Sequence, residues 1–392
     1  MSTPQKALAD LILIETAERP AGEYAGKLLA DLGATVVKVE RPTGAPTRHM
    51  GPFHRGESTL FHYLNTNKKS VVLDLSSPSD RAMLDALLAK ANGLIDDHDE
   101  RWGAAHGLTS TVVAAAHPHL VHCIITPFGQ GAPAEWQTAR PINVINAGGW
   151  AYHSPSETPP GKPPLKGAGR FLSDYEAGID AATALLASLH RQRQGKGGQF
   201  IDISEVEVQV NRVDGVLGRM LAGEAEPSDS RCAYDMGGPG TSFACKDGHI
   251  YIFMTTRLHW RGLIDLMGAP EWVQDFPEDW LEFHCTRDRV KAFRAHFAIW
   301  ALGQEKMAVS EAAQKLGVAI VPVNTAADLP RNAQFVHRGF FQTVDHPVFG
   351  RVAYPTAPYA MSATPVRIDA IAPALGSSTV ETGHVEAGHV DA

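Results

Sequence analysis

The sequence has few of the features that mark metal-binding, secreted or membrane proteins. Its 392 residues include only four cysteines: Cys123, Cys232, Cys245 and Cys285. None belongs to a Cys-x-x-Cys pair, so we expect neither a zinc site nor a disulfide scaffold. No run approaches the roughly 18 apolar residues of a membrane span, and the N-terminus lacks the basic and apolar regions of a signal peptide. We therefore expect a cytoplasmic protein without membrane contact.

Several ligand-binding motifs are also missing. The sequence contains no Walker A motif, no G-x-S-x-G elbow and no dinucleotide-binding fingerprint. The tail contains His384-x-Glu386-x-x-His389, but this spacing differs from a metalloprotease box, and Gly383 and Gly388 argue against a helix there. The formal net charge is -8 and the pI is about 6.1, which disfavours a nucleic-acid partner. We expect no bound metal.

The overall composition is that of an ordinary globular protein. Apolar residues make up 44% and charged residues 20% of the chain, so disorder is not expected. The 36 glycines and 26 prolines indicate many turns. A chain of this length exceeds what one hydrophobic core usually serves, so the sequence predicts two domains.

The first half of the chain alternates strand-like and helix-like patterns. Short apolar or β-branched runs predict strands at residues 11–15, 34–40, 70–75, 93–96, 120–125 and 199–204. Helical spacing predicts helices at 22–32, 77–91 and 205–221, and one that begins at Ser173-Asp174 and ends before Gly198. This alternation indicates a parallel sheet with helices on both faces. We expect an α/β fold with a Rossmann-like large domain.

The composition changes at Gly223–Ser230, which predicts a polar linker. Beyond it we expect a smaller, inserted α+β domain with one strand at 248–254 and helices at 258–267, 287–302 and 306–316. We assign residues 1–225 to the first part of the large domain, 226–328 to the small domain, and 329–392 to a return segment of the large domain.

Three phrases carry a resemblance to a known family. The first is the run LADLGATVVKVERP at Leu29–Pro42, and the second is LNTNKKSVVLDL at Leu64–Leu75. The third is FLSD at Phe171–Asp174, with GKGGQFIDIS at Gly195–Ser204 after it. Together they closely resemble the class III CoA-transferases, also called the CaiB/BaiF family, which includes formyl-CoA transferase and carnitine CoA-transferase. The resemblance covers nearly the whole chain in order, but it leaves the donor and acceptor acids unassigned.

Asp174 stands where a loop meets a predicted helix, so a helix N-cap is one interpretation. A helix N-terminus also stabilises a carboxylate, so we expect a lowered pKa there. An ionised carboxylate can attack a thioester. The resemblance implies that Asp174 is the nucleophile, and that the reaction passes through an aspartyl anhydride, an aspartyl-CoA thioester and a second anhydride.

The resemblance also implies residues that bind CoA, which would be a substrate rather than a tightly bound cofactor. Arg41 matches the position that packs on adenine, and a guanidinium plane can stack on such a ring. Arg48, Lys68 and Lys69 lie in the nucleotide-binding segments and could meet phosphates. Arg101 lies where the family has a basic residue near the pantetheine. A solvated charge is the alternative interpretation for Arg41, Lys68 and Lys69, and the acidic residues around Arg101 depart from the family's usual pattern.

A glycine cluster follows the predicted linker. Gly237, Gly238 and Gly240 resemble the family's loop that covers the reaction intermediates, although Pro239 interrupts the match. A generic flexible turn is the alternative interpretation. The resemblance further implies a homodimer of two interlocked chains, with acyl-CoA and carboxylates as the small-molecule partners.

Two other functions stay open. The α-methylacyl-CoA racemases share this fold and hold an aspartate at the matching site, but they pair it with a histidine. Arg140 occupies that histidine position here, and His153 lies nearby in the sequence. A racemase needs two acid–base groups on opposite faces of the α-carbon, so a transferase is preferred. A CoA-binding protein without turnover is the other alternative.

Overall fold

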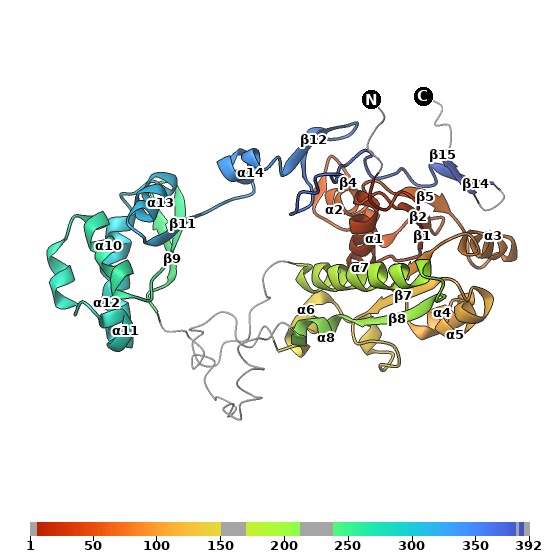
Figure 1. The fold of residues 1–392 in the computed structure, drawn as a ribbon, viewed down its shortest axis with the longest axis horizontal. Helices are drawn as coiled ribbons and strands as arrows, with labels where there is room; N and C mark the ends of the chain where they lie inside the picture. The colour runs from red at the N-terminus through yellow and green to blue at the C-terminus, as the bar shows by residue number, and fades with distance from the viewer. Residues whose placement is uncertain (1–5, 150–169, 212–237, 382–383, 388–392) are drawn as a thin grey trace. The chain divides into compact units, whose positions relative to one another are not determined.

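The computed structural model describes residues 6–149, 170–211, 238–381 and 384–387 (Figure 1). These residues form two compact units. The described part of the first unit contains residues 6–149, 170–211, 339–381 and 384–387, and that of the second unit contains residues 238–338.

The first unit is built on a six-stranded sheet in which every neighbouring pair is parallel. The spatial order is β5 (Lys69–Val72), β2 (Thr35–Glu40), β1 (Ile12–Glu15), β6 (Gly93–Asp96), β7 (Val121–Thr126) and β8 (Gln199–Ser204). The chain runs outward from β1 in one direction and then restarts at β6 in the other. This predicted parallel α/β sheet is confirmed, and its direction changes between β1 and β6.

Helices cover both faces of the sheet, as the alternation of side chains on β1 requires. Leu13 belongs to one core cluster, with residues of α1 (Pro20–Asp31) and α7 (Leu172–Arg193). Ile14, its neighbour, belongs to a second cluster with α3 (Pro78–Leu88). The inner strands are mostly buried, and this is why they appear in the sequence as continuous apolar runs, whereas the edge strand β8 is largely exposed.

Helices α1 and α7 approach each other closely at Gly178. A Cβ atom on Gly178 would lie 2.8 Å from the carbonyl oxygen of Ala21 and 3.0 Å from a ring carbon of Tyr24. A side chain there would therefore push apart the N-terminal halves of the two helices. This contact matters for the site because Asp174 lies in the first turn of α7.

Shorter elements complete the first unit. They are β3 (Phe53–His54), β4 (Glu57–Ser58), α2 (Thr59–Leu64), α4 (Glu100–His106), α5 (Ser110–Ala116), α6 (Pro141–Ala147), α8 (Glu205–Asn211), β12 (Phe341–His346), β13 (Gly350–Pro355), β14 (Ser378–Glu381) and β15 (His384–Ala387). The C-terminal segment is bonded to the sheet edge, where the backbone N–H of Gly376 donates to the Ser70 hydroxyl at 3.0 Å.

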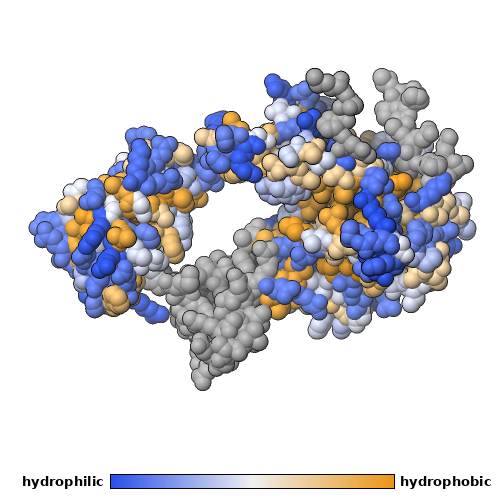
Figure 2. Space-filling view, in the orientation of Figure 1, coloured by the Kyte–Doolittle hydropathy of each residue, from blue (hydrophilic) through white to orange (hydrophobic). Residues whose placement is uncertain are grey.

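Large apolar side chains are exposed on α7, β8 and α8. Ile179, Phe200 and Val210 are 46%, 38% and 44% exposed. Figure 2 shows apolar residues gathered over this part of the first unit. Among the described residues, no helix is both long and apolar enough to cross a membrane.

The second unit has an antiparallel sheet with the order β11 (Ala319–Val323), β10 (Gly248–Phe253) and β9 (Thr241–Cys245). Its helices are α10 (Arg257–Met267), α11 (Trp280–Phe283), α12 (Arg287–Ala301), α13 (Lys306–Lys315) and α14 (Ala333–His337). The core is aromatic, and the rings of Trp260 and Trp280 lie 5.6 Å apart in an edge-to-face arrangement. The predicted strand at 248–254 and the three predicted helices are confirmed.

Candidate active site

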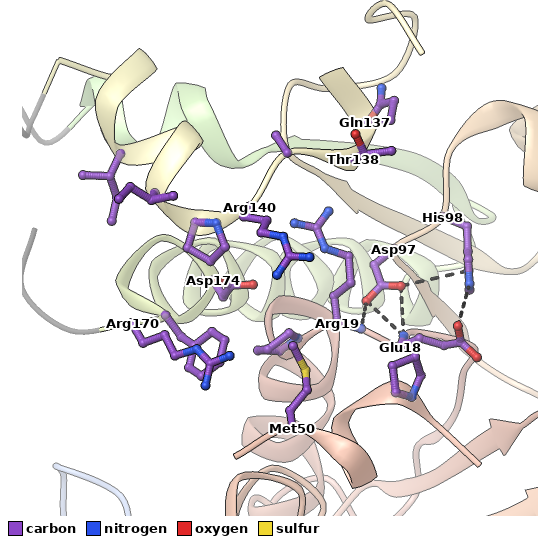
Figure 3. A pocket seen from close by; sticks show the side chains of 17 residues that line it. Glu18, Arg19, Met50, Asp97, His98, Gln137, Thr138, Arg140, Arg170 and Asp174 are labelled. Atoms are coloured by element: carbon purple, nitrogen blue, oxygen red, sulfur yellow. Dashed lines mark hydrogen bonds and ion pairs between the residues drawn. The ribbon is translucent and has the colours of Figure 1, made fainter. Parts of the chain in front are cut away.

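A cavity of the first unit opens at the carboxyl ends of β1 and β6, where the strand order changes direction. Open parallel sheets bind ligands at such switch points. The cavity measures about 910 Å³. Figure 3 shows the side chains that line it: Glu18, Arg19, Pro20, Pro46, Met50, Asp97, His98, Gln137, Thr138, Ala139, Arg140, Pro141, Ile142, Ile145, Arg170, Phe171 and Asp174.

Asp174 lies in the first turn of α7, and it is the carboxylate that this helix brings to the cavity. The residue is only 1% exposed. Its Oδ2 atom has no hydrogen-bond partner among the residues that the structure describes. The N-cap of α7 is Phe171, and no side chain caps the helix. The interpretation of Asp174 as an N-cap is therefore wrong.

The surroundings of Asp174 favour its protonated form. Burial is the largest influence, and the nearby Glu205 carboxylate adds repulsion, while Arg19 acts in the opposite direction. Together they raise the pKa of Asp174 to about 8. The expectation that the helix N-terminus lowers this pKa is wrong, because desolvation and a like charge outweigh the helix dipole.

Arg19 is a cation at the cavity that sequence reasoning missed. It follows β1 and directly precedes α1, so in the sequence it resembles an ordinary residue at a helix start. Asp97, which follows β6, accepts hydrogen bonds from the backbone N–H groups of Glu18 at 2.9 Å and Arg19 at 2.6 Å. The Arg19 guanidinium lies 2.9 Å from Oε1 of Glu205. Arg19 follows β1 and is thus held by Asp97, which follows β6, and by Glu205, which follows β8.

Two further arginines face the cavity around Asp174 (Figure 3). Arg140 is the N-cap residue of α6. Arg170 donates to the Gly51 carbonyl oxygen at 3.1 Å, and its guanidinium carbon lies 4.9 Å from the centre of the Phe171 ring. The cavity therefore combines one buried carboxylate with three guanidinium groups, an arrangement suited to anionic substrates.

A second cavity of about 340 Å³ lies at the ends of β2 and β5. Arg41 lines it, half exposed, and its Nε atom donates to Oε1 of Glu18 at 2.7 Å. The opposite lining is a stack of rings, with His98 3.6 Å from Trp102 and Trp102 4.2 Å from His106 between centroids. Glu18 and His98 line both cavities, so the two cavities adjoin.

His98 is held as a cation between these cavities. Burial opposes its protonation, but Asp96 at 2.6 Å and then Glu18 favour it, so the pKa of His98 rises to about 10. Within the described ranges, Asp96, Asp97 and His98 are the group of ligand atoms close enough together to hold a metal ion. A protonated imidazole offers no lone pair to a metal, so we read this group as an ion pair.

Arg48 and Lys68, which we expected to contact phosphates, line neither cavity. Arg48 donates to both carboxylate oxygens of Glu40, at 2.7 and 2.8 Å. Lys68 is buried and donates to Glu15 at 2.7 Å, to the Glu23 carbonyl oxygen at 2.7 Å and to Asn65 at 2.9 Å. A phosphate could reach Lys68 only by breaking these bonds. The surroundings of both residues indicate a structural role.

Lys69 and Arg101 also line neither cavity. Lys69 is the first residue of β5, whereas the cavities lie at the carboxyl ends of the parallel strands. Arg101 is exposed on α4, and its Nε atom lies 3.9 Å from Oδ2 of Asp99. The expected contacts of these two residues with CoA gain no support from their positions.

The predicted glycine loop belongs only in part to the described residues. Gly237 lies outside the described residues, and Gly238 and Gly240 belong to the second unit. The carbonyl oxygen of Gly238 accepts a hydrogen bond from Arg294 at 3.1 Å. The role of this loop stays a prediction. His153, the alternative acid–base group, also lies outside the described residues.

Comparisons with known proteins agree with the resemblance seen in the sequence. A family model described as CoA-transferase family III matches residues 8–379. Succinyl-CoA:glutarate CoA-transferase of Mus musculus is 28% identical over 356 residues, which are 89% of this chain and 79% of that protein. The BbsE subunit of succinyl-CoA:(R)-benzylsuccinate CoA-transferase of Thauera aromatica is 27% identical over 376 residues, 92% of this chain and 90% of that subunit.

The fold is also similar to solved structures. The crystal structure of a CaiB/BaiF family protein from Brucella suis matches with a TM-score of 0.82 and 25% identity, covering 95% of this chain and 97% of that one. The structure of Rv3272 from Mycobacterium tuberculosis matches with a TM-score of 0.76 and 22% identity, over 95% and 98% of the two chains.

Proposed function

This chain belongs to CoA-transferase family III and is a CoA-transferase, and we propose that Asp174 is the nucleophile of its reaction. The observation that carries this proposal is a buried carboxylate at the main cavity, with one oxygen that has no partner among the described residues. A buried polar atom without a partner is costly, and at a cavity such a cost is typical of a group kept for a substrate.

The proposed reaction consists of four nucleophilic attacks on carbonyl carbons, and Asp174 takes part in each of them. An oxygen of Asp174 attacks the thioester carbonyl, the CoA thiolate leaves, and a mixed anhydride forms. The thiolate then attacks the side-chain carbonyl of Asp174 and releases the donor acid. The acceptor carboxylate attacks the resulting aspartyl thioester, which returns the thiolate and gives a second anhydride. Attack of the thiolate on the acceptor carbonyl releases acyl-CoA and restores Asp174.

The cavity offers electrostatic support for these steps. Each attack on a carbonyl places negative charge on an oxygen, and guanidinium groups already in place can stabilise it. Arg19 is the best candidate for this role, because its ion pair with Glu205 and the hydrogen bond that its backbone N–H donates to Asp97 hold it at the cavity.

We assign the nucleotide end of CoA to the second cavity. Arg41 and the stacked rings that end at His98 offer flat surfaces for an adenine. The cavity adjoins the main one through Glu18 and His98, so an extended thioester could occupy both. CoA is a substrate in this proposal. A homodimer stays a prediction, and the exposed apolar side chains on α7, β8 and α8 are candidates for its interface.

We further propose a dicarboxylic acid as the acceptor. Two relatives are named for succinyl-CoA with glutarate or (R)-benzylsuccinate. One carboxylate of such an acid would react with Asp174, and the other needs a cation in the same cavity. Arg140 and Arg170 meet this need, because both line the cavity with Asp174.

An exchange assay with succinyl-CoA tests this proposal. Glutarate should accept CoA far better than butyrate, which lacks the second carboxylate. Arg140→Gln and Arg170→Gln should lower kcat/KM for glutarate by about tenfold or more. Arg193→Gln is the matched control, since Arg193 ends α7 and pairs with Asp10 on the surface. Equal use of glutarate and butyrate, or equal losses in all three variants, would contradict the dicarboxylate assignment.

A further inference from the structure

Two histidines outside the site described above are joined by a direct hydrogen bond. His62 belongs to α2 and His346 ends β12, and the Nε2 atom of His346 lies 3.0 Å from the Nδ1 atom of His62. His346 is buried, and the side chain of His62 is only 12% exposed. β12 is the strand at which the chain returns to the first unit, and Figure 1 shows it beside α2. The bond thus connects the hairpin β12–β13 to α2.

The partners of the two rings determine which nitrogen carries a proton. The backbone N–H groups of Val348 and Phe349 donate to Nδ1 of His346, at 3.1 and 3.2 Å, so this atom holds a lone pair. Nε2 of His346 then carries the proton and donates it to Nδ1 of His62. The proton of His62 is therefore on Nε2, which lies 3.5 Å from Oε2 of Glu57. This set of hydrogen bonds requires both rings to be neutral.

The turn of the hairpin packs on the same pair. The Phe349 ring stacks on His346 with 4.3 Å between the centroids, and it meets the His62 ring edge to face at 5.0 Å. Arg55, between β3 and β4, donates to the Val348 carbonyl oxygen at 2.7 Å. The bond between the histidines therefore lies at the centre of the contact between the hairpin turn and α2.

The surroundings of the two rings favour their neutral forms. Burial lowers the pKa of His62, Glu57 acts in the opposite direction, and Arg48 supports the lowering. Burial also lowers the pKa of His346, the neighbouring His62 adds to this effect, and Glu57 again opposes it. The other titratable side chains nearby are His54, Arg55, Asp345 and Arg351. Both rings should therefore be neutral at pH 7 and take up protons only in acid.

We propose that the His62–His346 hydrogen bond is a pH-sensitive latch: it fastens the hairpin β12–β13 to α2 while both rings are neutral, and it opens when either ring takes up a proton from water. A proton on Nδ1 of His62 would face the N–H group of His346, so two donors would meet. A proton on Nδ1 of His346 would displace the two backbone N–H groups of the turn. In each case one N–H bond forms, and no other covalent bond changes. This inference is independent of the proposed role of Asp174.

The latch lies one helical turn from residues that support the wall of the main cavity. Ser58, the N-cap of α2, donates to the carbonyl oxygen of Met50, and Arg170 donates to that of Gly51. Met50 and Arg170 both line the cavity. Opening of the latch would therefore loosen the helix that supports this wall.

Hydrogen exchange measures whether the latch opens in acid. Amide exchange of residues 341–355 is followed by mass spectrometry at pH 7.5 and 5.0 and corrected for the intrinsic rates. An unfolded histidine titrates near pH 6.5, and the folded rings titrate lower, so the stabilisation by the latch is present above this pH and decreases below it. Protection of the hairpin in the wild type should fall about tenfold, the factor for one pKa unit.

Two variants test the origin of this response. The double variant His62→Asn/His346→Asn cannot take up these protons, so its exchange should not depend on pH in this range. His117→Asn is the matched control, because His117 pairs with Asp85 at 2.9 Å, away from the hairpin, and it should keep the wild-type response. A wild-type response in the double variant would overturn the proposal.

A measurement on the wild type decides if the double variant does not fold. The histidine rings are labelled with ¹⁵N and titrated by NMR, and His62→Asn and His346→Asn identify the two resonances. At pH 7.5 both rings should be neutral with the proton on Nε2, and they should gain protons below pH 6.5 as protection of the hairpin falls. A proton on Nδ1 of either ring at pH 7.5, or titration of both rings with unchanged hairpin exchange, would overturn the proposal.

Discussion

Replacing Asp174 by asparagine should stabilise the protein at alkaline pH, because the native surroundings oppose the ionised form. The native carboxyl group keeps its proton up to pH about 8, whereas the unfolded chain loses it near pH 4. Between these values the folded state binds more protons, so the stability of the wild type falls as the pH rises. Asparagine does not titrate, and the stability of Asp174→Asn is free of this loss.

The size of the expected stabilisation follows from the difference between the pKa values of Asp174 in the folded and unfolded states. Each pKa unit corresponds to about 1.4 kcal/mol, so the rise from about 4 to about 8 sets an upper bound of about 5 kcal/mol. Asp174 borders a cavity where its charged form can be partly solvated, so we expect a smaller gain of about 1–3 kcal/mol. The difference between variant and wild type should be near zero at pH 4 and largest above pH 8.

Thermal and urea unfolding of both proteins at pH 5, 7 and 9 measures this difference. Asp31→Asn serves as the control, because Asp31 has an ion pair with Lys27 to lose and should be destabilised by the same chemical change. An Asp174→Asn protein that is less stable than the wild type at pH 9 would refute the reasoning. A difference that does not depend on pH would also refute it.

Three other predictions follow from the structure. Arg41→Ala should raise KM for the CoA thioester with little change in kcat, because the adenine is remote from the reacting carbonyl; an unchanged KM and CoA affinity would remove Arg41 from the site. Lys68→Met should lower the free energy of unfolding by about 3–5 kcal/mol, because Glu15 loses a buried partner; a loss of CoA affinity without a loss of stability would instead indicate phosphate binding. The enzyme should not exchange the α-hydrogen of 2-methylacyl-CoA esters in D₂O, because Arg140 stands where the racemases have histidine; deuterium uptake as fast as CoA exchange would revive the racemase interpretation.

Much of the fold was predictable because its strands and helices have characteristic local patterns of apolar residues. The inner strands β2, β1, β6 and β7 are mostly buried and appear as short apolar runs. The strand β11 was not predicted as such, since Pro322 interrupts it. The structure explains this proline, because β11 lies at the edge of its sheet, where a missing N–H donor is tolerated.

The candidate site was only partly predictable. The sequence singled out Asp174 through its family resemblance, but its pKa depends on groups that local spacing does not reveal. Arg19 and Glu205 are far apart in the sequence, and each resembles an ordinary helix-start residue. Lys68 illustrates a second limit of sequence reasoning, since Asn-Lys-Lys looks like a polar surface turn, whereas the Lys68 side chain is buried. Its buried partner Glu15 lies 53 positions away, so only the folded chain shows the pair.

The most direct test of the central claim is covalent trapping at Asp174. The enzyme is incubated with an acyl-CoA donor and then with hydroxylamine or borohydride, and the peptide that contains residues 173–178 is examined by mass spectrometry. The account predicts modification of Asp174 in the wild type, and loss of both modification and transfer, by about a thousandfold or more, in a folded Asp174→Asn enzyme that still binds CoA. Transfer that survives in Asp174→Asn, with no modified peptide in the wild type, would contradict it.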